Sequence, residues 1–134
     1  MLRYAVAFIA AAVVFAGLDV LWLGTIAYKL YQQEIGALLL ARPRLDAAIA
    51  FYVVYLVGLT FFAVRPGLAA GSLVKTLGYA AAFGFVAYAT YDLTNLATLK
   101  GFSAKVVAAD LAWGVVVSSA ASAAAFFAGR LIAR

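Results

Sequence analysis

The sequence contains no cysteine and no histidine. The absence of cysteine excludes disulfide bonds, thiol redox chemistry and thiolate zinc sites, and without either residue the usual axial ligands of haem are missing. Histidine is also the side chain that titrates most readily near neutral pH. Any acid–base chemistry must therefore fall to Asp, Glu, Tyr or Lys, and the sequence indicates neither a metal site nor a cofactor.

Charged residues are scarce as well. They make up 11% of the 134 residues, whereas 69% are hydrophobic; a soluble globular domain has about 25% charged and about 45–50% apolar residues. This composition predicts an integral membrane protein. The net charge of +5 does not indicate nucleic-acid binding, because the basic residues lie at the ends of apolar segments, where Lys and Arg anchor membrane spans. We expect no nucleic-acid partner.

Four apolar segments are each near the ~20 residues that a helix needs to cross a bilayer. They are longer than barrel strands and lack the alternation of period two that a barrel requires. Short connections between them favour antiparallel neighbours. We therefore predict an all-α integral membrane protein with one domain over residues 1–134, whose four transmembrane helices form an up-down antiparallel bundle. The predicted spans are about residues 4–28, 45–64, 74–99 and 106–132.

The three connections carry different signals. Residues 29–44, "KLYQQEIGALLLARPR", predict a short helix that either lies in the membrane interface or extends the first span. The "RPG" at 65–67 indicates a turn after the second span. The "KGFS" at 100–103 indicates a tight turn, with Ser103 capping the fourth span. Small residues favour close packing of the third and fourth spans, namely Gly78, Ala82, Gly84, Gly114, Ser118 and Ala121.

Three aspartates fall inside the predicted spans, although a charged side chain is costly there. Asp19, Asp92 and Asp110 come from different spans. The helical rise of about 1.5 Å per residue nevertheless places all three roughly 5–9 Å from the membrane midplane, on the side opposite to the termini. Ionisable side chains in a membrane face the bundle interior or a water-filled cavity. We therefore predict a polar pocket in that half of the bundle.

Helical spacing adds neighbours to this pocket. Tyr88, Asp92 and Asn95 share one face of the third span, and Asp110 and Trp113 share one face of the fourth. The predicted ligand-binding residues are Asp19, Trp22, Tyr52, Tyr55, Tyr88, Tyr91, Asp92, Asn95, Asp110 and Trp113. The candidates for a catalytic acid or base are Asp92, Asp110 and Asp19, with Tyr91 or Asn95 binding a substrate.

Each of these residues also has a structural interpretation. The aspartates could serve only to hydrogen-bond neighbouring helices. Trp22, Tyr28, Tyr31 and Trp113 lie where an aromatic belt at the membrane interface would lie. The sequence leaves both interpretations open.

Four motifs are spread along the chain: "LDVLWLG" at 18–24, "FYVVYLVG" at 51–58, "YDLTNLATLKG" at 91–101 and "DLAWG" at 110–114. They resemble the signature blocks of a bacterial family of small predicted membrane proteins, domain of unknown function 2177. The resemblance implies a multi-span membrane protein and implies no particular activity. The residues that match the family motifs are Asp19, Trp22, Tyr91, Asp92, Thr94, Asn95, Asp110 and Trp113.

The basic residues do not decide the orientation in the membrane. Five lie on the side of the termini and five on the opposite side, so the positive-inside rule gives no preference. The N-terminal amine adds one positive charge to its own side. We therefore expect a bacterial inner (cytoplasmic) membrane protein with both termini in the cytoplasm.

Three functions are compatible with these patterns. The first is binding of a membrane lipid or small amphiphilic molecule, with or without a reaction on it, whose polar head would meet Lys29, Arg44 and Lys100 near the pocket mouth. The second is cation- or proton-coupled transport by a homodimer, with oxygens of Thr94 and Asn95 beside the carboxylates. The third is an accessory role in a larger membrane complex. We favour the first, and the sequence does not decide whether the protein is an enzyme.

Overall fold

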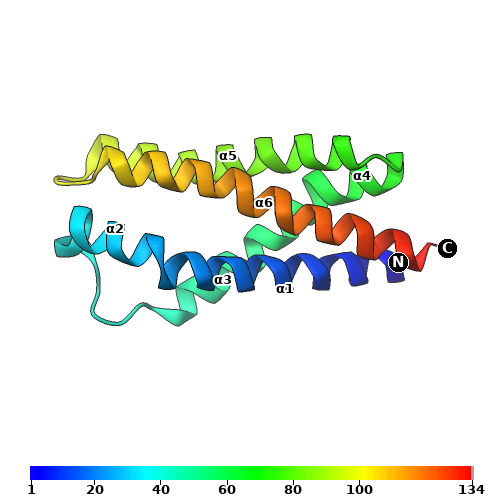
Figure 1. The fold of residues 1–134 in the computed structure, drawn as a ribbon, viewed down its shortest axis with the longest axis horizontal. Helices are drawn as coiled ribbons and strands as arrows, with labels where there is room; N and C mark the ends of the chain where they lie inside the picture. The colour runs from blue at the N-terminus through cyan, green and yellow to red at the C-terminus, as the bar shows by residue number, and fades with distance from the viewer. Residues whose placement is uncertain (134) are drawn as a thin grey trace.

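A computed structural model describes residues 1–133, which form helices joined by short connections, without a strand (Figure 1). The elements are α1 (Leu2–Gly24), α2 (Ile26–Ile35), the 3₁₀ turn η1 (Gly36–Leu38), α3 (Leu45–Leu59), the π-helical segment η2 (Thr60–Val64), α4 (Arg65–Ala70), α5 (Leu73–Thr98) and α6 (Ala104–Ile132). Within these residues, four continuous helical segments are long and apolar enough to cross a membrane: α1, α3 through α4, α5 and α6. The predicted all-α, four-span architecture is confirmed.

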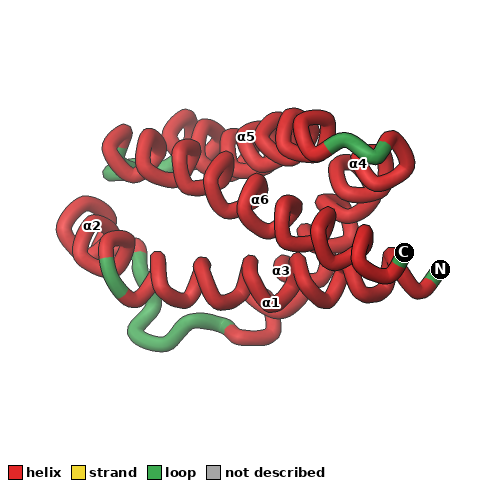
Figure 2. The backbone as a smooth tube through the Cα atoms, turned by 45° about the vertical axis from the view of Figure 1, so that its right-hand side comes forward, coloured by secondary structure: helices red, strands yellow, loops and turns green. Residues whose placement is uncertain are grey.

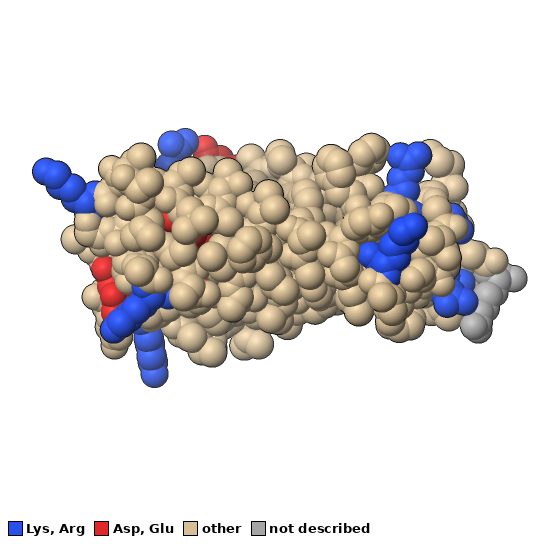
Figure 3. Space-filling model, turned by 90° about the horizontal axis from the view of Figure 1, so that it is seen from above, with Lys and Arg blue, Asp and Glu red and all other residues tan. Residues whose placement is uncertain are grey.

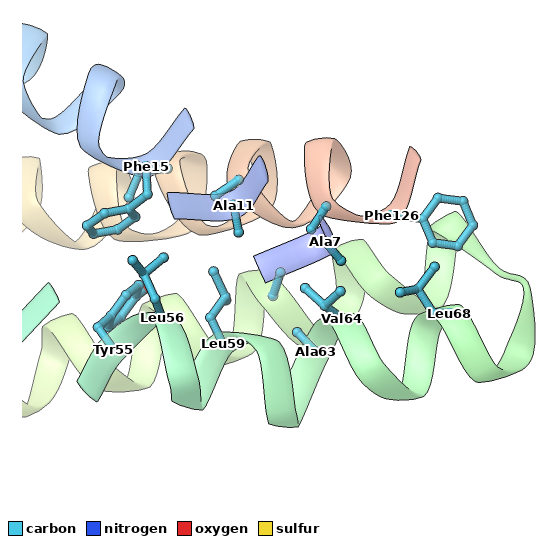
Figure 4. Packing of buried hydrophobic residues seen from close by; sticks show 14 residues of the cluster. Ala7, Ala11, Phe15, Tyr55, Leu56, Leu59, Ala63, Val64, Leu68 and Phe126 are labelled. Carbon is cyan, nitrogen blue, oxygen red and sulfur yellow. The ribbon is translucent and has the colours of Figure 1, made fainter. Parts of the chain in front are cut away.

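The four spans run alternately up and down the long axis of the molecule, so that the start of α1 and the end of α6 lie at the same end (Figure 1). Helix α6 packs along both α1 and α5. The second span crosses obliquely, since α3 contacts α1 whereas α4 contacts α5, and Figure 2 shows this crossing from a second direction. The end with the two termini is the more tightly packed, with large side chains such as Phe15, Leu59, Val64 and Phe126 fully buried (Figure 4).

Helices α5 and α6 approach each other closely where two glycines face each other. A Cβ atom built on Gly114 would lie 3.0 Å from the carbonyl oxygen of Gly84, and one on Gly84 would collide with the Gly114 carbonyl oxygen and the Ser118 hydroxyl. The expected packing of small residues is therefore present at these three positions. By contrast, Gly78 and Ala82 are exposed on the outer side of α5.

The second span ends later than predicted, and the prediction of a turn at 65–67 is wrong. The helix continues to Ala70, and the chain reverses at Gly71, whose positive φ of 63° is accessible to glycine. Pro66 is accommodated in the first turn of α4 because the preceding segment is π-helical: the Arg65 N–H donates to the carbonyl of Thr60, five residues back. Proline has no N–H to donate, and the widened π-helical turn before it lets the helix continue without that hydrogen bond.

The other turn prediction is correct. Residues 99–103 connect α5 to α6 with Gly101 at φ 75°. The Ser103 hydroxyl accepts a hydrogen bond of 3.1 Å from the Lys105 N–H and so caps α6.

The segment after α1 follows the second of its two predicted alternatives: α2 extends the first span beyond a break at Thr25 (Figure 1). The span itself ends at Gly24, four residues earlier than predicted. Helix α2 turns Ala27 and Ile35 inward, where both are buried, and it packs against α6. The chain after η1 then returns toward the bundle to begin α3.

The first half of α3 leaves the bundle open on one side. Every residue from 45 to 51 is exposed, and burial by the other helices begins at Tyr52 and Tyr55. Charged side chains on the face seen in Figure 3 gather at the two ends of the long axis, with an uncharged band between them. The long axis therefore corresponds to the membrane normal, and the open half of α3 lies within the apolar band.

Candidate functional site

A cavity of about 400 Å³ occupies the half of the bundle that lies away from the termini. It is formed where α3 diverges, so that α1 and α2 make one wall, α5 the other, and α6 the floor. Its lining residues are Asp19, Trp22, Leu23, Tyr31, Ile35, Leu39, Phe51, Ala87, Tyr88, Tyr91, Asp92, Val106, Asp110 and Trp113. Three spans that are distant in the sequence thus each contribute one aspartate to the same cavity. This agrees with the common membrane depth predicted for these three residues.

Seven of the ten predicted ligand-binding residues line this cavity: Asp19, Trp22, Tyr88, Tyr91, Asp92, Asp110 and Trp113. The other three lie nearby or outside. Tyr52 donates a hydrogen bond to Asp19 from the second span. Tyr55 is buried beneath the cavity, where its hydroxyl bonds that of Ser118 and its ring lies 6.0 Å from the Tyr88 ring. Asn95 sits one turn beyond Asp92, outside the lining.

Asp19 is held by donors on both of its oxygens. The Tyr52 hydroxyl donates to Oδ2, and the Trp113 indole N–H donates to Oδ1 at 3.2 Å. Trp113 in turn stacks on Trp22 with ring centroids 4.8 Å apart and planes within 7° of parallel. This aspartate therefore ties α1, α3 and α6 together, which fits the structural interpretation for this position.

Asp110 accepts a hydrogen bond from the Tyr31 hydroxyl, which comes from α2. Burial raises the pKa of Tyr31 well above its usual range, and the hydrogen bond to Asp110 and the nearby charge of Asp92 raise it further. Tyr31 therefore stays protonated and remains a donor to this carboxylate. The contact links α2 to α6 across the cavity.

Asp92 has the least favourable surroundings of the three aspartates. Its side chain is fully buried, and neither of its carboxylate oxygens has a hydrogen-bond partner among residues 1–133. Its direct neighbour in the cavity wall is the carboxyl group of Asp110. A buried polar group without a partner costs stability, and a buried charge costs more. Asp92 thus lacks the hydrogen-bond donors that hold Asp19.

The four residues of the aromatic-belt interpretation do not all face the same way. Trp22, Tyr31 and Trp113 line the cavity, whereas Tyr28 is 60% exposed and points outward. Two neighbouring rings of one helix, Tyr28 and Tyr31, are thus divided between the outer surface and the site. The spacing of Ala27, Tyr31 and Ile35 at i, i+4 and i+8 is the sequence signal that could have assigned Tyr31 to the inner face.

Several apolar lining residues were also missed by the sequence analysis, namely Leu23, Ile35, Leu39, Phe51, Ala87 and Val106. Leu23, Phe51 and Tyr91 are 45%, 46% and 58% exposed, so they form a rim where the cavity reaches the outer surface. These three residues belong to α1, α3 and α5. The opening is therefore lateral, between membrane-spanning helices, and faces the apolar band of the molecule.

The basic residues expected at the pocket mouth are not in its wall. Among the described lining residues, none is Lys or Arg. Arg44 pairs with Asp46 at 2.9 Å at the exposed start of α3, and Lys29 and Lys100 are exposed elsewhere. Lys105 lies 3.7 Å from Glu34, which also accepts a hydrogen bond of 2.8 Å from Ser103 and so fastens α2 to the start of α6. The cavity thus carries acidic groups without basic counterparts.

Neither the curated proteins nor the solved structures include a match to this chain. The family described as "Predicted membrane protein (DUF2177)" matches residues 4–127, which is most of the chain and includes every residue of the cavity wall. The four motifs noted in the sequence lie within this range, and the four-span architecture agrees with the description of the family. The chain belongs to the DUF2177 family of predicted membrane proteins.

Proposed function

We propose that the protein binds a membrane lipid or small amphiphilic molecule in the lateral cavity, with the polar head against the acidic floor and the apolar chain toward the rim. The observation that carries this proposal is Asp92, a fully buried carboxylate without a hydrogen-bond partner in the described chain, placed at the wall of a cavity. A bound molecule that donates hydrogen bonds to Asp92 would satisfy this group.

The size and lining of the cavity support the proposal. Ligand sites are generally clefts of about 300–1,000 Å³ with mostly apolar walls and a few polar groups that orient the ligand, and this cavity has about 400 Å³. Its polar groups gather around Asp92 and Asp110, whereas Leu23 and Phe51 supply apolar side chains at the rim. A molecule with one polar and one apolar end matches this division.

A reaction on the bound molecule would fall to the same groups. Asp92 and Asp110 are adjacent, and Tyr31 donates a hydrogen bond to Asp110, so this trio can hold and move a proton at the polar head. Tyr91 would bind the substrate because it lines the cavity, whereas Asn95 lies outside the cavity wall. Asp19 contributes by positioning, because both of its oxygens are already occupied.

The geometry favours this function over cation transport. Among the described residues, the acidic side chains form no group of three or more that could hold a metal ion. Asp19 is bonded to Tyr52 and Trp113, which leaves only the pair Asp92 and Asp110 for a cation.

We also propose that the protein lies in the bacterial inner membrane with both termini in the cytoplasm.

Lipid analysis of purified protein tests the proposal. The wild type and two variants are extracted from native membranes in mild detergent, and co-purifying lipids are identified by mass spectrometry. Ala87→Phe fills the cavity wall, and Ala82→Phe adds the same bulk on the exposed outer side of α5. We expect a lipid class enriched at least about tenfold over bulk membrane in the wild type and in Ala82→Phe, and lost in Ala87→Phe. Enrichment in none of the three, or in all three alike, contradicts the proposal.

A further inference from the structure

The chemistry of the cavity wall specifies which kind of polar head fits. Resting on the proposed function, we infer that the occupant carries a protonated primary amine as its head group. The described lining contains three aspartates, no basic residue and several aromatic faces. A bound molecule must therefore supply both the missing hydrogen-bond donors and the missing positive charge.

An account of donors shows where the head group belongs. Asp19 already receives donors from Tyr52 and Trp113, and Asp110 receives one from Tyr31. Asp92 receives none from the described residues. The oxygens that still lack a hydrogen-bond donor are thus those of Asp92 and the second oxygen of Asp110. An ammonium group that contacts Asp110 is also adjacent to Asp92, so one positive charge can interact with both carboxylates.

Other common head groups satisfy this demand less well. An ammonium group has three N–H donors and makes charge-assisted hydrogen bonds to carboxylates, which are the stronger kind. A hydroxyl group offers one donor and no charge, and a carboxylate head, or a phosphate head without an amine, offers neither and is repelled. The chain's own cations do not change this, because none of the described lining residues is Lys or Arg.

The aromatic side chains around the floor favour the same class. Tyr88, Tyr91 and Trp113 line the cavity beside the aspartates. Aromatic faces attract an ammonium group through the ring quadrupole, more strongly in a site from which water is excluded. The amine could belong to a simple alkylamine or to the ethanolamine of a phospholipid, and the shared feature is the primary ammonium group.

The protein carries its own reporter for a test. Its two tryptophans, Trp22 and Trp113, both line the cavity and stack on each other, so quenching of intrinsic fluorescence by a bromine-labelled chain reports entry into this site. Wild-type protein in phosphatidylcholine nanodiscs is titrated with brominated twelve-carbon chains whose heads are a primary amine, a trimethylammonium, an alcohol or a carboxylate. A further titration uses brominated phosphatidylethanolamine, and it distinguishes a phospholipid source of the amine from a simple alkylamine.

We expect the primary amine, as an alkylamine, as phosphatidylethanolamine or as both, to quench at concentrations about tenfold or more below those of the other heads. Asp92→Asn should remove this preference, while Asp46→Asn, at the exposed start of α3, keeps it. The head series needs only wild-type protein, so a variant that fails to fold does not weaken the test. An alcohol or trimethylammonium chain that binds as tightly as the amine overturns the assignment of the amine and leaves the proposed function intact. Absence of quenching by every chain overturns both.

Discussion

Asp19 and Asp92 differ in their neighbours more than in their depth. Both belong to spans that run in the same direction, and both line one cavity. Asp19 is bonded to an indole and a phenol, whereas Asp92 has no partner among the described residues. The same residue type thus links helices through hydrogen bonds in α1 and lacks hydrogen-bond partners in α5. Only the three-dimensional arrangement of donors distinguishes the two.

Tyr31 allows a prediction about pH. Because its folded-state pKa is raised above the ordinary value of 10.0, its contribution to stability is complete below pH 10 and is lost as the pH rises further. We expect Tyr31→Phe to lower the free energy of unfolding by about 1–3 kcal/mol at pH 7. The difference from wild type should shrink above pH 10, by up to about 1.4 kcal/mol per pH unit.

Thermal unfolding in detergent between pH 7 and pH 11 measures this difference. Tyr28→Phe is the matched control, since Tyr28 lies in the same helix but is 60% exposed, and it should behave as wild type does. A difference between wild type and Tyr31→Phe that stays constant up to pH 11 would show that the phenol does not titrate as described.

The sequence predicted the three aspartates of the site but not Tyr31. The depth of an aspartate in a membrane helix follows from span limits and helical rise, which are local quantities. The position of Tyr31 depends on the break at Thr25, which redirects α2 toward α6. Gly24, directly before the break, is a residue type that often ends helices, but it does not indicate the direction in which the next helix leaves. The lack of hydrogen-bond partners at Asp92 likewise depends on tertiary structure, because it depends on where the tyrosine hydroxyls of the other helices lie.

Among the elements, the close pair α5 and α6 is the framework of the site, since it carries both Asp92 and Asp110. Its spacing depends on Gly84 and Gly114. We expect Gly84→Ala to cost about 1–3 kcal/mol of stability, because its methyl group would collide with the Gly114 carbonyl oxygen and the Ser118 hydroxyl. The matched substitution Gly78→Ala has open space around the new methyl group, and it should be neutral or stabilising by up to about 1 kcal/mol.

Unfolding titrations in mixed micelles compare the two variants. The fluorescence of Trp22 and Trp113 then reports whether loss of helix spacing also disturbs the cavity. Equal stability of Gly84→Ala and Gly78→Ala would mean that the two helices do not need their close approach.

The second span shows why its end could not be predicted from local signals. Arg-Pro-Gly is a common turn sequence, yet here the π-helical segment from Thr60 to Val64 lets the helix continue past Pro66. The apolar residues after it, including the buried Leu68, stabilise that continuation by packing. The preference of a tripeptide is outweighed by burial that becomes visible only in the folded bundle.

For the molecule as a whole, the even number of spans puts both termini on the same side of the membrane, and this topology can be tested. The chain has no cysteine, so a single introduced cysteine is a unique label. We expect Lys100→Cys, in the turn between α5 and α6, to react with a membrane-impermeant maleimide in intact spheroplasts. Arg130→Cys, near the end of α6, should react only after the membrane is permeabilised. The reverse pattern would invert the orientation, and labelling of both sites from outside would contradict the four-span architecture.

The distribution of charge along the long axis also has an energetic consequence. All five acidic residues lie in the half away from the termini, where five basic residues balance them, whereas Arg3, Arg65, Lys75 and Arg130 at the opposite end have no acidic neighbour among residues 1–133 (Figure 3). The protein is therefore an electric dipole aligned with the membrane normal. A transmembrane potential acts on each elementary charge with about 2.3 kcal/mol per 100 mV. In an energised membrane, four unbalanced cations favour the orientation that places the termini on the negative side by on the order of 9 kcal/mol per 100 mV.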